Sequence, residues 1–411
     1  MTKRFTIISG RFAFYIFALV LLSNCSKVDV NTRSSTKSYS FDTKFATLQA
    51  GVVDNNGEYL YITLLNIFTN ETELFKFDLN TLEKVKSYSV ELPNTITFGH
   101  NLLYATDNHL YGLQQSYLAG TGNYEVTTKF TPDLQIVGTD TVFRLDSVPP
   151  FIPSLNLRSR LCQPAAGQFA RATTILDYNL KYGIRYELMD GEFNRVKTVV
   201  DTSSYPGIGF RLGVNQMLPT SDGGYIVNGV SATPTTGIDF FIEKRDADFN
   251  QLWTTTYSTP AVENIAGTIE SNGYFYSYVK ELNPETQIYN LFMLQHDDQG
   301  NLVKRLDLKS SGKETTLRET FEQTADGGFL CPGMTSVNAT QSSSKAILYK
   351  VSPDLEIESY EVFGESVISG NIYKISDNKF VYVYGEMGFG PEEGDLRTVL
   401  TYVDQNGKVI K

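Results

Sequence analysis

Short runs of alternating apolar and polar residues cover most of this 411-residue chain, and clusters of Asp, Asn, Gly and Pro separate them. A period of two places successive side chains on opposite faces of a strand, so the runs predict half-buried β-strands. Segments 240–244 and 346–350 are clear examples, and each is followed by a turn and a second, shorter run. The chain is therefore expected to be all-β.

One turn sequence, Asp-Gly-Gly followed by an aromatic residue, occurs twice. It lies within segment 220–229 and again within segment 324–330. Asp and Gly tolerate the positive φ angles that a tight hairpin needs, so each copy predicts a turn between two strands. Its return about a hundred residues later indicates a structural repeat.

Related turns, each followed by an apolar strand, recur along the whole chain. Their central residues are Asn56, Asn108, Ala166, Gly223, Asn272, Gly327 and Asn378. The mean interval is about 54 residues. A second series of turns lies between them, at 78–80, 132–134, 190–192, 246–248, 297–300, 352–354 and 404–407. Each period therefore holds four strands, in the order A, turn, B, loop, C, turn, D.

Seven such periods predict a seven-bladed β-propeller with four antiparallel strands per blade. A single unit cannot bury both of its faces, and radial stacking solves this problem. A β-helix would have a shorter repeat, and two β-sandwiches would not keep one interval throughout. The Asp-Gly-Gly-[Tyr/Phe] turns resemble those of secreted bacterial lipoproteins, Bacteroidetes-like in style, that carry propeller repeats. The resemblance covers residues 45–411, but propellers host many functions.

The two ends of the repeat determine how the ring closes. The first strand A is expected near 45–52, and the last strand D at 408–411. Closure would then rest on packing of blade 1 against blade 7, unless residues 39–42 add a strand at that seam.

The first residues read as an export signal. Lys3, Arg4 and Arg11 precede an apolar run, 12–22, which is shorter than the roughly 20 residues of a membrane span. Segment 22–25 resembles a bacterial lipobox, in which the signal is cut before a cysteine that is then lipidated. We therefore expect a signal peptide at 1–24, lipidated Cys25 and a tether at 25–44, and the propeller at 45–411. The implied location is the outer membrane, on its periplasmic or surface face, with the lipid as the sole membrane attachment. An ordinary signal peptide or an uncleaved anchor is the alternative.

Charge and cysteine content limit the partners. The formal net charge of −11 argues against a nucleic-acid footprint, which needs a basic surface. Cys162 and Cys331 fall three blades apart in the repeat, and a disulfide needs Cα atoms within roughly 7 Å. Both are expected to be buried free thiols, and the chain is expected to be a monomer.

The repeat assigns the connections to two faces. The tight A–B and C–D turns share one, here called the turn face, and the B–C and D–A connections share the other, the loop face. Acidic residues of the turn face are explained as turn formers. Segment 246–257 lacks the glycine and the closing glutamate of a calcium loop, so no metal site is expected. The longest loop-face inserts are 144–156 and 385–395.

A candidate ligand site lies where the first residues of the A strands face the loop side of the channel. Its residues are His100, Arg158, Arg160, Arg211, Glu263, Arg318 and Glu319. Several arginines around one mouth would suit a carboxylate or sulfate through bidentate hydrogen bonds. The cluster is similar to that of sialidases, although their Ser-x-Asp-x-Gly-x-Thr-Trp box is absent. Arg–Glu pairs within the mouth are the alternative interpretation.

The sequence carries no Gly-x-Ser-x-Gly, His-Glu-x-x-His or phosphate-binding glycine motif, so no catalytic residue or cofactor is assigned. The first hypothesis is an envelope-anchored protein that binds a glycan, a peptide or a partner protein through the loop face. The second is a glycoside hydrolase or lyase that acts on an anionic saccharide at the channel mouth, with Glu263 and Glu319 as an acid–base pair. The third is a structural subunit of an envelope complex.

Overall fold

The computed structural model describes residues 38–43, 47–65, 72–89, 95–118, 122–143, 159–176, 182–202, 211–233, 237–259, 262–282, 289–312, 320–336, 344–364, 367–387 and 396–410. Within these segments the regular elements are β-strands, numbered β1 to β28. A search of the same segments finds no helix with the length and apolar character of a membrane span.

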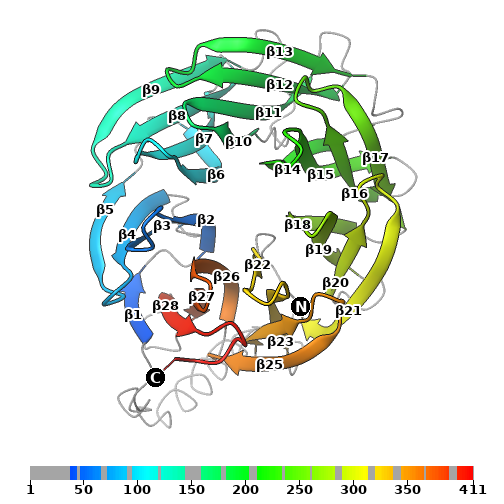
Figure 1. Cartoon of the computed structure of the whole chain (residues 1–411). Helices are drawn as coiled ribbons and strands as arrows, with labels where there is room; N and C mark the ends of the chain where they lie inside the picture. Colours follow the sequence, from blue (N-terminus) through cyan, green and yellow to red (C-terminus); the bar gives the residue numbers. More distant parts are fainter. Residues whose placement is uncertain are drawn as a thin grey trace, which may run out of the picture.

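The strands form seven four-stranded antiparallel sheets, arranged as blades around a common centre (Figure 1). Blade 1 contains β2 (Thr47–Val53), β3 (Tyr59–Leu65), β4 (Thr72–Asp78) and β5 (Lys84–Ser89), and blade 2 contains β6 (Thr95–Tyr104), β7 (Leu110–Leu118), β8 (Gly122–Phe130) and β9 (Ile136–Phe143). Blade 3 contains β10 (Ser159–Ala165), β11 (Gln168–Leu176), β12 (Tyr182–Asp190) and β13 (Arg195–Asp201). Blade 4 contains β14 (Arg211–Pro219), β15 (Tyr225–Thr233), β16 (Gly237–Arg245) and β17 (Gln251–Tyr257). Blade 5 contains β18 (Val262–Ser271), β19 (Tyr274–Leu282), β20 (Tyr289–His296) and β21 (Leu302–Gly312). Blade 6 contains β22 (Glu322–Gln323), β23 (Phe329–Ser336), β24 (Ser344–Val351) and β25 (Ile357–Phe363). Blade 7 contains β26 (Val367–Ser376), β27 (Lys379–Met387), β28 (Leu396–Val403) and β1 (Ser38–Thr43). The predicted seven-bladed propeller is confirmed.

The outermost strand of blade 7 comes from the other end of the chain. Strand β1 pairs antiparallel with β28, from Ser38 opposite Thr401 to Thr43 opposite Leu396. The expected D strand at 408–411 is wrong, because Val409 makes only an isolated bridge to Val403. The ring is therefore closed by the strand considered at 39–42, and the propeller includes residues 38–43, ahead of the boundary expected at 45.

The Asp-Gly-Gly turns have the local geometry that their sequence predicts. Gly223 and Gly327 both have a φ of 83°, a left-handed conformation that glycine adopts without a Cβ clash. The second glycine is needed for a different reason: a Cβ on Gly224 would lie 2.3 Å from the carbonyl oxygen of Arg245. Each glycine of the motif thus has its own structural role.

The C–D turns place bulky side chains in the core from left-handed backbone. The non-glycine residues concerned are Leu82 (66°), Leu134 (58°), Phe193 (62°), Phe249 (66°) and Leu355 (52°). In blade 4, Phe249 N donates to Asp246 O at 3.0 Å, and the register shifts beside it, as in a type I turn with a bulge. Burial of each apolar side chain offsets a backbone cost of about 1–3 kcal/mol.

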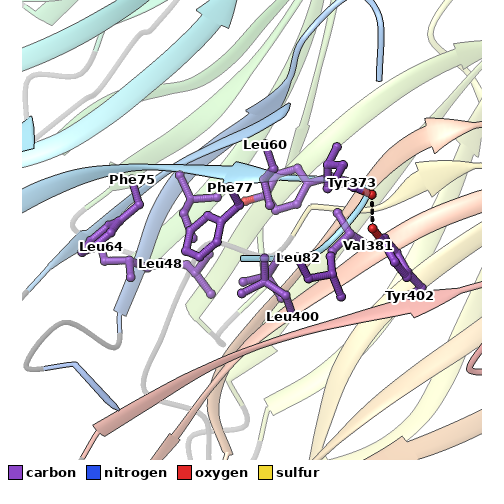
Figure 2. Packing of buried hydrophobic residues seen from close by; sticks show 13 residues of the cluster. Leu48, Leu60, Leu64, Phe75, Phe77, Leu82, Tyr373, Val381, Leu400 and Tyr402 are labelled. Carbon is purple, nitrogen blue, oxygen red and sulfur yellow. Dashed lines mark hydrogen bonds between the residues drawn. The ribbon is translucent and has the colours of Figure 1, made fainter. Parts of the chain in front are cut away.

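The hydrophobic core is divided among the seams between neighbouring blades. Figure 2 shows the seam that joins the two ends of the ring, where Leu60 and Phe77 of blade 1 pack with Val381 and Leu400 of blade 7. The hydroxyl of Tyr402 donates to the carbonyl of Leu79 across this seam. Side-chain packing therefore supports the strand pairing that closes the ring.

Candidate functional site

The described turns lie together on the turn face. In blade 1 the amide of Leu79, in the C–D turn, donates to the carbonyl of Glu58, in the A–B turn, at 2.8 Å. The two loop-face inserts predicted from the sequence overlap residues 144–158 between β9 and β10 and 388–395 between β27 and β28, which lie outside the described residues.

Acidic residues of the C–D turns are used within the turns. Asp246 Oδ1 accepts from the amides of Asp248 and Asn250, both at 2.8 Å, and its Oδ2 accepts from Asn250 Nδ2 at 2.8 Å. Asp190 and Asp297 repeat this arrangement in blades 3 and 5. Burial opposes ionisation of Asp246, but these hydrogen bonds lower its pKa. The acids are turn formers, as predicted, and no group of metal ligands occurs among the described side chains.

Acidic residues of the A–B turns bind lysines that the sequence did not single out. Lys244 Nζ lies 2.6 Å from Asp222 Oδ2, and Lys129 Nζ lies 3.0 Å from Asp107 Oδ2. Hydrogen bonds from Lys244 and Thr220 lower the pKa of Asp222 to about 2. A lysine near the end of strand C, just before the next turn, is the signal that could have identified these pairs.

Arg160 joins the innermost strands of adjacent blades. It lies on β10, and its Nε donates to the carbonyl of Asn215 on β14. Asn215 Nδ2 in turn donates to Asn264 Oδ1 and to Ile265 O, both at 2.9 Å, on β18. Arg160 is thus linked through Asn215 to Asn264, which follows Glu263 in the chain.

Glu263 lies inside the seam between blades 4 and 5. It is 1 % exposed, its Oε1 accepts from Thr259 Oγ1, and its Oε2 is buried without a hydrogen-bond partner. Burial raises the pKa of this carboxyl to about 7, and the charges of Asp239 and Glu281 act in the same direction. A carboxyl with this pKa can hold or release a proton near neutral pH.

The remaining candidates are only partly placed. Arg211 and His100 lie on the innermost strands β14 and β6, as expected for channel positions, but only their backbone is described. Arg158, Arg318, Glu319 and the predicted lipidation site Cys25 lie outside the described residues. Arg160 and Glu263 are therefore the two whose surroundings are known. Cys162 and Cys331 are free and buried, which confirms that prediction.

Two buried glutamates and their arginines were also missed. Glu243 accepts from Arg245 Nε at 2.9 Å, while Arg245 Nη2 lies 2.6 Å from Asp201 Oδ2 of the preceding blade. Arg245 also lies over the ring of Tyr186, 4.2 Å from its centroid. Glu243 and Arg245, which directly follow the apolar run 240–242 on the same strand, were the available signal. The second glutamate, Glu187, accepts from Arg171 on the neighbouring strand.

No protein-family model and no curated protein matches the chain. Among solved structures, the polysaccharide lyase Uly1 superposes with a TM-score of 0.53 at 11 % identity, covering 89 % of this chain and 99 % of the lyase. The extracellular domains 1–2 of Drosophila Semaphorin 1a give 0.50 at 7 % identity, covering 88 % and 86 %. The Dos1 propeller gives 0.48 at 10 % identity, covering 87 % and 78 %. Such low identities establish a shared fold and nothing further.

Proposed function

We propose that the chain is an envelope lipoprotein that binds a glycan, a peptide or a partner protein through its loop face. The observation that carries this proposal is the contrast between the two faces. On the turn face, short turns use their carboxylates for internal hydrogen bonds and ion pairs. On the loop face the connections vary from the short link between β17 and β18 to residues 144–158. Variable connections on a rigid scaffold are where propellers and other folds place binding residues.

The position of β1 supports this arrangement. Its first residue, Ser38, pairs with Thr401, close to the turn that follows β28, while Thr43 pairs with Leu396 at the loop-face end. A tether from a lipidated Cys25 would therefore join the propeller near the turn face. The loop face would remain free for a partner in the outer-membrane environment.

Binding can be tested on glycan and peptide arrays and by co-purification from envelope extracts. Replacement of residues 144–158 or 388–395 by Gly-Ser linkers should abolish a captured interaction. The matched turn-face variant Asp298→Asn, at an exposed turn position, should retain it. Loss of binding in Asp298→Asn but not in the linker variants would contradict the proposal. For the anchor, mass spectrometry of the mature N-terminus should find lipid on Cys25, whereas a free amine at another residue would exclude it.

Cleavage of an anionic saccharide is a second candidate, favoured by the pKa of about 7 at Glu263, which suits a general acid or base at neutral pH. Binding is favoured over cleavage because Glu263 is only 1 % exposed. Incubation with polygalacturonate should release new reducing ends or unsaturated products if this activity exists, and Glu263→Gln should abolish it. Cleavage that persists in Glu263→Gln would rule out a catalytic role for this residue.

A further inference from the structure

The outermost strand of each blade has one edge with which no other described strand pairs. Natural sheets protect such edges with charged side chains, because an added strand would have to bury the charge. Six of the outer strands carry a charged residue within their regular pairing: Lys86 on β5, Asp140 on β9, Lys197 on β13, Arg305 on β21, Glu361 on β25 and Asp42 on β1. Strand β17 carries no charged residue at all.

The sequence of β17 also favours the addition of a strand. It reads Gln-Leu-Trp-Thr-Thr-Thr-Tyr, so it is rich in aromatic and β-branched residues and has neither glycine nor proline. Its regular pairing with β16 covers residues 253–257. In an antiparallel pair every second residue directs its amide and carbonyl away from the partner, and Thr254 and Thr256 are exposed. The outer edge of β17 can therefore accept another strand.

The inner face of β17 is fixed to blade 5. Trp253 Nε1 donates to Asp298 O at 2.8 Å, and Thr255 Oγ1 donates to Gly300 O at 2.9 Å. Both acceptors belong to the C–D turn of blade 5. A strand that is already held in its extended form loses little conformational freedom when another strand pairs with it.

Strand β21 provides a surface beside this edge. It follows the C–D turn that β17 contacts, and it is the next strand outward in blade 5. Leu306 and Leu308 pack toward blade 6, so the alternate residues Val303, Arg305 and Asp307 face blade 4. These three, here called the β21 ledge, are 52 %, 41 % and 69 % exposed. A strand added to β17 would lie with one face on this ledge.

The arrangement excludes a second copy of the chain as the added strand. Two β17 strands would pair antiparallel about a two-fold axis perpendicular to their joined sheet. That axis leaves blade 5 of each copy on the same side of the sheet. Each blade 5 would then occupy the space next to the β21 ledge of the other copy. The edge therefore suits a segment that has no blade packed against it.

We propose that the outer edge of β17 binds an extended peptide segment of a partner protein by β-strand addition. Hydrogen bonds of the main chain supply the affinity, and alternate side chains supply the specificity. The segment is uncharged where it lies beside β17, and it places an apolar side chain on Val303. Figure 1 shows β17 at the outer rim of the ring. The site is thus separate from the loop face and does not depend on what binds there.

The fluorescence of Trp253 tests this site directly, because it is the one tryptophan of the sequence and lies on β17 itself. The full chain is titrated with the acetylated and amidated peptide Thr-Val-Thr-Val-Thr-Val-Thr. A saturable change in emission is expected, together with slower hydrogen exchange at the amides of residues 251–257. The control peptide has proline in place of the central valine and so lacks one main-chain donor. It should give neither effect.

Lysine substitutions locate the binding. Thr254→Lys places on β17 the kind of charge that the other edges carry, and should weaken peptide binding about tenfold. Thr198→Lys is the matched control, because Thr198 lies opposite Glu187 in blade 3 as Thr254 lies opposite Glu243 in blade 4, and it should bind as the natural chain does.

Three results would overturn the proposal. The first is the absence of a saturable change with the valine peptide, and the second is equal binding of the proline peptide. The third is equal affinity in the two lysine variants, which would place the peptide elsewhere. Analytical ultracentrifugation adds a further check: a dimer that Thr254→Lys dissociates would assign the edge to a second copy of the chain instead.

Discussion

Lys350 and Asp326 form an ion pair that joins the end of β24 to the A–B turn of blade 6, with Nζ 2.8 Å from Oδ1. The lysine is 1 % exposed and also donates to Thr324 Oγ1 at 2.8 Å. The aspartate of the Asp-Gly-Gly turn therefore has two functions: it caps the amide of Gly328 at 3.0 Å and neutralises a buried ammonium group. Lys244 and Asp222 do the same in blade 4.

Replacement of this lysine should change the acid stability. Burial opposes ionisation of Asp326, but hydrogen bonds from Lys350 and Thr324 outweigh it and lower its pKa to about 2. A lowered folded-state pKa contributes stability above the unfolded value, near 3.9, and this contribution is lost as the pH falls toward 2. Lys350→Met should therefore cost about 1 kcal/mol at pH 7 and progressively less below pH 4. Urea unfolding from pH 7 to 2.5 measures the difference, and an equal cost at all pH values would contradict it.

Glu263 should affect stability in the opposite pH direction. Because burial raises its folded-state pKa to about 7, the carboxyl stabilises the fold when protonated, below about pH 4.5, and this contribution is lost as the pH rises through 7. Glu263→Gln resembles the protonated form and should be more stable than the natural chain by about 2 kcal/mol at pH 8. The two proteins should unfold alike at pH 4.5. A variant that is less stable at pH 8 would show that the charged form is accommodated.

A disulfide can test the ring closure. Ser40 lies directly opposite Val399 in the β1–β28 pair, so cysteines at these two positions should form a bond when the chain is oxidised. The bond should raise the free energy of unfolding by about 2–4 kcal/mol. Ser40→Cys with Val403→Cys is the matched control, since Val403 pairs with Val409 instead. Peptide mapping by mass spectrometry distinguishes the two, and bonding only in the control would contradict the register.

At the left-handed turn positions, substitution by glycine should destabilise the fold no more than substitution by alanine, which is the reverse of the usual order. Phe249 has a φ of 66° and is fully buried, with its ring stacked on Tyr186 at 5.7 Å between centroids. Phe249→Ala should cost about 3–5 kcal/mol, and Phe249→Leu much less, because Leu82 and Leu355 occupy equivalent turns. Phe249→Gly should be no worse than alanine, because glycine accepts positive φ without strain. Thermal unfolding gives the order, and a glycine variant clearly below alanine would disprove the strain.

The repeat could be predicted because turn chemistry is local. An Asp-Gly-Gly segment forms its hairpin from neighbouring residues, so its spacing reports the blades directly. Closure by β1 could only be raised as an alternative, since the pairing of residues 38–43 with 396–401 joins opposite ends of the chain. Register along the strands placed Arg160 and Glu263 on the innermost strands β10 and β18, but it predicted neither their partners nor the burial of Glu263. Lys350 shows why: in an alternating strand a lysine is expected to be exposed, and only the fold reveals that it is buried against an aspartate of a turn.

The pairing of β1 with β28 also sets the order of assembly. Strand β1 precedes β28 by more than 350 residues in the chain, so the ring cannot close before β28 has been synthesised. Until then β1 and the edge of β28 have no partner, and blades 1 and 7 each have one uncovered face. The chain can therefore reach its native fold only after its seventh blade has been synthesised.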